Sequence, residues 1–179
     1  MKRFELAIPV NAQDHDLGPG HAPVTVVEYG DFECPNCKQA APAVKMLLER
    51  FTGRVRLVWR HFPLEEVHPR ALGAALASEV AAAQAKFWPM HDALFDNQRH
   101  LDPAHLRGHA QRLELDLRRY DADMSDTVYL QRVREDIEGA RTSGVRSTPT
   151  FFVNGAIHDV SFGLQGLFEA VEAALTKGR

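Results

Sequence analysis

Two strand-like segments separated by a helical one constrain the fold of this chain more than any other feature. Residues 24–29 read VTVVEY, a short run of mostly β-branched side chains that is typical of a strand buried on both faces of a sheet. Residues 54–60 read RVRLVWR, where apolar and basic side chains alternate, which indicates a second strand. Between them, residues 44–51 carry apolar side chains at helical spacing. A strand, a helix and a strand of this length predict a right-handed parallel crossover.

In the remainder of the chain, the spacing of apolar residues changes twice, from strand-like to helical and back. From about residue 65 to 142 the apolar spacing is helical, which predicts an all-helical insertion of about four helices. Strand patterning returns over residues 150–160, where Asn154-Gly155 between two apolar runs predicts a hairpin. Residues 164–175 then carry the apolar stripe of a closing amphipathic helix.

The composition allows one well-buried core and gives no reason to expect a nucleic-acid or membrane partner. The chain has 179 residues, of which 45% are apolar and 25% charged, and a formal net charge of -3. No apolar run approaches the roughly 20 residues that span a bilayer. Because Lys2 and Arg3 are not followed by the apolar core of a signal peptide, the sequence predicts a cytoplasmic protein. A leader removed from the chain would change this expectation.

The two cysteines of the chain, Cys34 and Cys37, lie between the first strand and the first helix. They could form a structural disulfide, but a cross-link over so short a loop restricts the unfolded chain very little. They could contribute to a zinc site, but such a site needs four ligands, and histidines such as His105 and His109 would have to complete it. Histidines in that setting more often lie on a solvated face. We therefore predict no metal.

The position of Cys34 favours a redox centre instead. Pro35 is the expected first residue of the helix, so unpaired N–H groups and the positive end of the helix dipole point at the Cys34 sulfur. Such groups stabilise a thiolate and lower a cysteine pKa from about 8.5 into the range of roughly 3.5–7.5. Cys37, one helical turn later, is placed to attack a mixed disulfide formed at Cys34. No cofactor is required, because the cysteine pair itself carries two electrons.

The cysteine segment and a second motif together suggest a family. The segment FECPNC at residues 32–37, with GVRSTPTFFVNG at residues 144–155, resembles the DsbA-like thiol-disulfide oxidoreductases of the thioredoxin superfamily. The resemblance extends from about Gly18 to the end of the chain. It implies that Cys34 is the nucleophile and Cys37 the resolving thiol.

The same resemblance assigns roles to other positions. Pro149 matches the cis-proline beside the disulfide, and Thr148 matches the residue whose backbone pairs with substrate peptides. Pro35 and Asn36, between the cysteines, support the active site. Pro42 matches the kink of the active-site helix.

Glu28 matches the buried acid of the family. It lies inside an apolar strand, so we expect burial to raise its pKa and let it carry a proton to or from Cys37. The alternative is a carboxylate that simply pairs with Arg56 or Arg60 on the neighbouring strand.

The resemblance implies an α/β protein with a thioredoxin fold, a central mixed sheet flanked by helices, and an all-helical insertion. The expected parts are a lead-in over residues 1–22, a core over 23–63 and 145–179, and the insertion over 64–144. One position departs from the family pattern: Asn36 stands where many strongly oxidising members carry histidine. Because an amide adds no positive charge beside the thiolate, we expect a moderate oxidant or a reductase.

The function implied is dithiol–disulfide exchange with cysteine-containing proteins or peptides, with an unidentified partner that recycles the cysteine pair. Two alternatives stay open. The chain could be a disulfide isomerase, although isomerases generally dimerise to hold substrates, or a non-catalytic binding or chaperone module with a thioredoxin fold. Phe87 and Trp88 could line a substrate groove, but packing in the core is the simpler interpretation.

Overall fold

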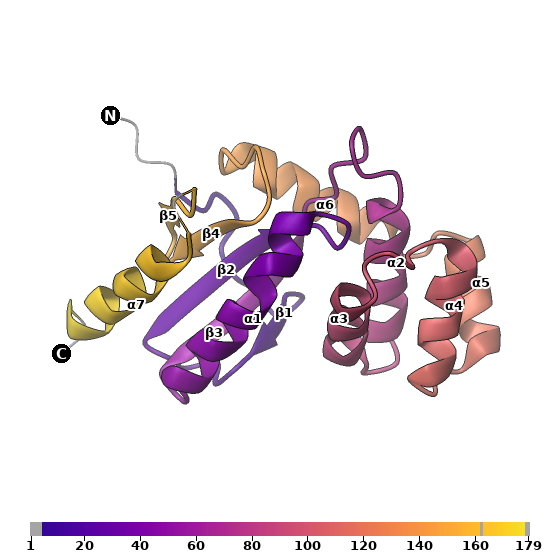
Figure 1. The fold of residues 1–179 in the computed structure, drawn as a ribbon, viewed down its shortest axis with the longest axis horizontal. Helices are drawn as coiled ribbons and strands as arrows, with labels where there is room; N and C mark the ends of the chain where they lie inside the picture. Colours follow the sequence, from indigo (N-terminus) through magenta and orange to yellow (C-terminus); the bar gives the residue numbers. More distant parts are fainter. Residues whose placement is uncertain (1–4, 162, 178–179) are drawn as a thin grey trace. The chain divides into compact units, whose positions relative to one another are not determined.

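The computed structural model describes residues 5–161 and 163–177, which contain one five-stranded sheet and seven helices (Figure 1). The strands are β1 (His15–Leu17), β2 (Val24–Gly30), β3 (Val55–His61), β4 (Thr150–Val153) and β5 (Ala156–His158). The helices are α1 (Pro35–Arg50), α2 (Ala71–Ala82), α3 (Phe87–Asp96), α4 (Pro103–Arg112), α5 (Leu117–Ser125), α6 (Leu130–Thr142) and α7 (Gln165–Lys177). None of the helices within the described ranges combines the length and apolar character that crossing a membrane requires.

The described residues form two compact units. The sheet unit comprises residues 1–30, 39–60 and 138–179, as far as they are described, and the helical unit comprises residues 31–38 and 61–137. The helical unit therefore includes residues 31–38, with both cysteines, in addition to most of the predicted insertion. Helix α1 begins in the helical unit and continues through Pro42 into the sheet unit.

The sheet has the strand order β1-β3-β2-β4-β5. Strands β2 and β3 are neighbours, and α1 connects them in the chain, as the alternating runs predict. Strand β4 runs antiparallel to β2, with Val26 opposite Val153 and Tyr29 opposite Thr150. The predicted hairpin is confirmed: β4 and β5 are antiparallel, and Asn154 and Gly155 both adopt positive φ values, of 46° and 83°.

The end of α1 contacts α7 within the sheet unit. The rings of Phe51, directly after α1, and Phe168, on α7, lie 6.5 Å apart between centroids. Arg50 forms an ion pair with Glu172 and lies over both rings. Helix α7 in turn packs on β2 and β4.

The lead-in before residue 23 contributes a strand that the sequence analysis did not predict. Strand β1 pairs antiparallel with β3, with His15 opposite Trp59. Next to β1, the buried Asp14 carboxylate receives two hydrogen bonds of 2.8 Å from the buried Arg60 guanidinium. Arg60 also donates to the carbonyl oxygens of Ile8 and Pro9 at 2.8 and 3.0 Å. The Arg60 side chain thus fixes the segment from Ile8 to Asp14 to β3.

Gly30 ends β2 at a position where no side chain fits. A Cβ atom at this position would lie 2.1 Å from the Trp59 ring, and Trp59 is completely buried. The indole therefore packs directly on the backbone of the last residue of β2. Glycine is required here because of this close approach.

The helical unit differs from its prediction in the number of its helices. Five helices, α2 to α6, lie between β3 and β4 among the described residues, where about four were expected. Helices α4 and α5 are short and polar, and Glu114 between them adopts a φ of 57°, so the break is hard to see in the pattern. Helix α2 is buried around most of its circumference, Glu79 included, and not on one face only.

Candidate active site

The cysteine pair lies at the start of α1. Cys34 directly precedes Pro35, the first residue of the helix, and Cys37 lies within the first turn. Cys34 is 4% exposed and Cys37 is fully buried. The first residues of an α-helix have N–H groups without partners inside the helix, and Cys34 directly precedes these residues of α1. Asn36 lies between the two cysteines in the same turn.

The residues just before Cys34 are held by the buried carboxylate of Asp31. One oxygen of Asp31 accepts hydrogen bonds from the backbone N–H groups of Glu33 and Cys34, at 2.7 and 3.2 Å. The other oxygen accepts from the backbone N–H of Leu64 and bonds Nδ1 of His68, at 2.9 and 2.8 Å. All of these residues belong to the helical unit.

A second side chain of the helical unit holds the carbonyl groups of the same segment. Nε2 of Gln98, beyond the end of α3, donates to the carbonyl oxygens of Phe32 and Cys34 at 2.9 and 2.8 Å. The backbone N–H of Lys38 also donates to the Cys34 carbonyl, at 3.2 Å, in the first helical hydrogen bond of α1.

Glu28 lies on β2 in the sheet unit, opposite Phe151 of β4. It is 3% exposed, and burial raises its pKa from 4.5 to about 8. The alternative pairing with arginine is wrong, because Arg56 pairs with Asp16 and Arg60 with Asp14 instead. Glu28 is thus a buried carboxyl group that holds its proton at neutral pH.

Thr148 and Pro149 lie directly before β4 in the sheet unit, and the peptide bond between them is cis. Because Thr150 pairs with Tyr29, Pro149 lies at the same end of the sheet as Gly30, the last residue of β2. Thr148 is 5% exposed. The sheet unit therefore brings Glu28, Thr148 and Pro149 to neighbouring strands, and the helical unit holds Cys34, Pro35, Asn36 and Cys37.

The histidines that were considered as metal ligands have other roles. His105 bonds the carboxylate of Asp102, the N-cap of α4. His109 is 1% exposed, so the expectation of a solvated face is wrong for this residue. Its Nε2 donates to the carbonyl oxygen of His100 at 2.9 Å, and its Nδ1 faces Arg112. Burial lowers the pKa of His109, so this histidine is stabilised as a neutral ring.

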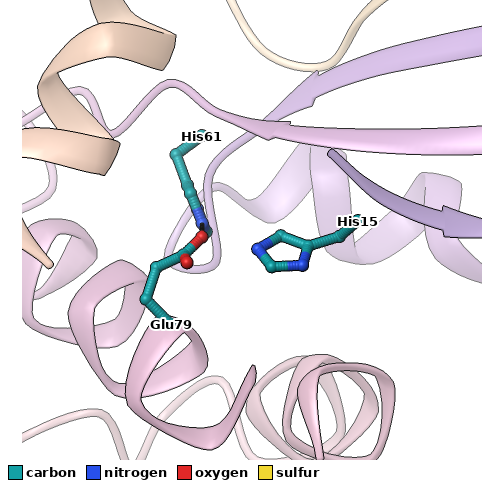
Figure 2. A group of neighbouring side chains, drawn as sticks. All are labelled: His15, His61 and Glu79. Carbon is teal, nitrogen blue, oxygen red and sulfur yellow. Dashed lines mark hydrogen bonds and ion pairs between the residues drawn. The ribbon is translucent and has the colours of Figure 1, made fainter. Parts of the chain in front are cut away.

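A further pair of buried titratable side chains lies in the helical unit. Nε2 of His61, at the end of β3, is 2.8 Å from a carboxylate oxygen of Glu79 on α2, and Figure 2 shows the two side chains pointing toward one another. The backbone N–H of His61 donates to Asp136 at 2.9 Å, and Asp136 pairs with Arg132 at 3.0 Å. Burial raises the pKa of Asp136. These bonds join β3, α2 and α6.

The aromatic residues near the start of α3 pack together. Phe87 is 5% exposed, and its ring centroid lies 5.1 Å from that of Trp88 and 6.2 Å from that of His91. Core packing is therefore the correct interpretation for Phe87. Trp88 is partly buried.

Sequence reasoning did not identify Asp31, His68 or Gln98. An aspartate a few residues before a helix start is a recognisable turn signal, since its side chain can accept from backbone N–H groups that follow it. Gln98 has no such signal, because it lies 64 residues from Cys34 in the chain.

Comparison with known proteins agrees with this fold. Residues 11–173 match the family model described as Thioredoxin, so the chain belongs to the thioredoxin family. Among solved structures, BdbD from Bacillus subtilis in its oxidised form is similar with a TM-score of 0.83 and 25% identity, over 91% of this chain and 93% of that one. A thioredoxin-like oxidoreductase from Silicibacter pomeroyi has a TM-score of 0.82 and 27% identity, over 93% and 94%. Within its superfamily the chain is a DsbA-like protein.

The chain also matches part of a longer type of protein. It is 51% identical over 177 residues to a protein from Salinispora arenicola named Na(+)/H(+) antiporter NhaA 1. The match covers 98% of this chain and 27% of that protein, so the chain spans about a quarter of the length of such relatives.

Proposed function

We propose that this chain is a thiol-disulfide oxidoreductase that exchanges the Cys34–Cys37 pair with cysteines of proteins or peptides. The observation that carries the proposal is the position of Cys34 directly before α1, with Cys37 buried in the first turn. The DsbA-like fold supports it. The cytoplasmic location stays a prediction.

The exchange has two balanced steps. The Cys34 thiolate attacks one sulfur of a substrate disulfide, the substrate S–S bond breaks, and the departing substrate sulfur takes up a proton. Cys37 then loses its proton and attacks the Cys34 sulfur of the mixed disulfide, which releases the second substrate thiol. Two electrons pass to the substrate, and the cysteine pair becomes a disulfide. The reverse sequence oxidises a substrate dithiol.

The other residues support these steps in the proposal. Glu28, which keeps its proton at neutral pH, exchanges a proton with Cys37. The backbone at Thr148, before the cis bond to Pro149, pairs with an extended substrate segment. The N–H groups of the first turn of α1 stabilise the Cys34 thiolate.

The central test is the reduction of insulin disulfides by dithiothreitol with and without the protein. We expect the wild-type protein to accelerate the reaction and Cys34→Ser to abolish the acceleration, because the nucleophile is lost. The same variant should keep any binding of unfolded chains. A wild-type protein that binds unfolded chains without accelerating the reaction would support a binding or chaperone module. Restoration of a scrambled disulfide protein would support an isomerase.

A second proposal concerns the partner of the cysteine pair. Because nearly the whole chain matches part of proteins named Na(+)/H(+) antiporter, we propose that an antiporter polypeptide is a redox partner of this unit. Cys37→Ala should trap partners as mixed disulfides at Cys34, since the resolving thiol is absent. We expect mass spectrometry to identify an antiporter among the trapped proteins, and Cys34→Ser to trap none. Trapped proteins without any antiporter would contradict this second proposal.

A further inference from the structure

The backbone around Cys34 is bonded at both its N–H and its C=O by side chains that lie elsewhere in the helical unit. Asp31 accepts from the N–H groups of Glu33 and Cys34, and its other oxygen bonds Leu64 and His68. Asp31 is 2% exposed, so these bonds are shielded from water. A buried carboxylate that accepts four hydrogen bonds holds its donors firmly, because charge-assisted bonds are stronger than neutral ones.

The carbonyl groups of the cysteine segment are held by a different side chain, Gln98. The amide nitrogen of Gln98 donates to the oxygens of both Phe32 and Cys34, so one side chain spans two peptide groups of the cysteine segment. An amide NH₂ group has two hydrogens, and both find acceptors here.

The side chain of Phe32 gives the segment an apolar anchor between these polar contacts. Phe32 is 1% exposed, and its ring lies 5.2 to 6.0 Å from the rings of Phe95, His91 and His61. The Phe32 ring anchors the start of the cysteine segment, while the two polar contacts hold the peptide groups of Cys34.

We propose that Asp31 and Gln98 are positioning residues that clamp the Cys34 peptide, Asp31 through its N–H and Gln98 through its C=O, so that the Cys34 sulfur stays at the N-terminus of α1. This inference deepens the proposed function and rests on it for its meaning, but its test does not need catalysis.

The clamp matters because of how a helix start binds an anion. The free N–H groups of the first turn reach the side chain of the preceding residue only when that residue keeps a non-helical, capping conformation. A Cys34 backbone free to rotate would carry its sulfur away from those donors for part of the time. The thiolate would then be less stable, and the Cys34 pKa would rise.

A purely electrostatic role for Asp31 predicts the opposite change of the Cys34 pKa. An anionic carboxylate near a thiolate repels it, so loss of the negative charge would stabilise the thiolate and lower the Cys34 pKa. The two explanations can therefore be separated by one substitution that removes the charge and keeps the shape.

Asp31→Asn is that substitution. Asparagine has one acceptor oxygen and one NH₂ group. Its oxygen can therefore accept from only one of the two sets of donors, and its NH₂ group faces the other set. The set left without an acceptor is either the N–H groups of Glu33 and Cys34 or the N–H group of Leu64. We expect the Cys34 pKa to rise and the rate of its alkylation by iodoacetamide at neutral pH to fall about tenfold, the scale of one lost charge-assisted hydrogen bond. The pKa is measured from alkylation rates across pH on the reduced full chain, with the adduct located at Cys34 by peptide mass spectrometry.

Gln98→Ala provides a second variant without any change of charge. We expect it to shift the Cys34 pKa upward as well, with alkylation slowed about threefold, because neutral hydrogen bonds are lost. It keeps the proposal testable if Asp31→Asn does not fold. The fold of each variant is checked by far-ultraviolet circular dichroism and urea unfolding.

Asp136→Asn is the matched control. Asp136 is also a buried aspartate of the helical unit, 4% exposed, that accepts a backbone N–H, but its partners are His61 and Arg132. We expect this variant to lose stability and to leave the Cys34 alkylation profile unchanged. An unchanged or lowered Cys34 pKa in Asp31→Asn, or an unchanged one in Gln98→Ala, would overturn the clamp. Absence of insulin reduction by the wild-type protein would instead overturn the proposed function, since the alkylation profile is measured without turnover.

Discussion

At the scale of single residues, Glu28 combines burial with an ionisable group. Its pKa of about 8 follows from loss of hydration, and the neighbouring Arg56 and Arg60 pair with other carboxylates. In the unfolded chain a glutamate ionises near pH 4.5. Between these two pH values the folded protein therefore holds a proton that the unfolded chain has released.

This difference predicts a pH dependence of stability. The raised pKa of Glu28 contributes stability that is fully present below pH 4.5 and is lost as the pH rises toward 8. The loss amounts to at most about 5 kcal/mol for a shift of this size. In Glu28→Gln the side chain stays neutral, so we expect the variant to match the wild type at pH 4 and to exceed its free energy of unfolding at pH 8.

Urea unfolding at both pH values measures this effect, and insulin reduction shows whether Glu28 also moves a proton. We expect Glu28→Gln to slow exchange on the order of 100-fold, because an amide cannot transfer a proton. Glu49→Gln is the control, since Glu49 is exposed on α1 and should change neither result. An exchange rate equal to that of the wild type would remove Glu28 from the mechanism.

At the scale of elements, the buried pair of Asp14 and Arg60 explains how the lead-in becomes part of the sheet. The two side chains are only 1% and 3% exposed. Removing one partner of such a pair leaves a charge buried without compensation.

We expect Asp14→Asn to lower the free energy of unfolding by about 3 kcal/mol or more. Asp16→Asn is a close control: it is the same change two residues away, and its partner Arg56 also lies on β3. Because the side chains of this second pair are 37% and 20% exposed, the control should cost about 1 kcal/mol or less. Urea unfolding of both variants measures the difference, and equal losses would contradict a special role for the buried pair.

The elements that could be predicted from the sequence are those with local signals. The two central strands, α1 and the Asn154-Gly155 hairpin each follow from a pattern within about ten residues. Strand β1 has three residues, two of them polar or charged, and depends on Arg60 more than 40 residues away. No local pattern could have revealed it.

The residues of the candidate site also fall into those with a local sequence signal and those whose partners are distant in the chain. The cysteine pair, Glu28 and the Thr148-Pro149 bond could be found because each belongs to a recognisable motif or an apolar strand. Asp31 has a local turn signal that was not used. Gln98 and His68 acquire their roles only through folding, since their partners lie 64 and 37 residues away in the chain.

At the scale of the whole molecule, the residues with predicted roles belong to two compact units. The helical unit carries the cysteines and the side chains that hold their backbone, and the sheet unit carries Glu28, Thr148 and Pro149. The sequence indicated an insertion but attached the cysteines to the core, because chain order alone places them between two core strands. The hydrogen bonds of Asp31 and Gln98 show why residues 31–38 group with the helices.

The close approach of Trp59 to Gly30 gives the protein an internal optical probe. An indole shielded from water fluoresces at shorter wavelength than one in solvent, and Trp59 is completely buried against the last residue of β2, four positions before Cys34. Only two tryptophans are present in the chain, so replacing Trp88 with phenylalanine would leave one emitter. The emission wavelength and fluorescence intensity of Trp59 would then report, in real time, how this end of β2 responds when the cysteines are oxidised or reduced.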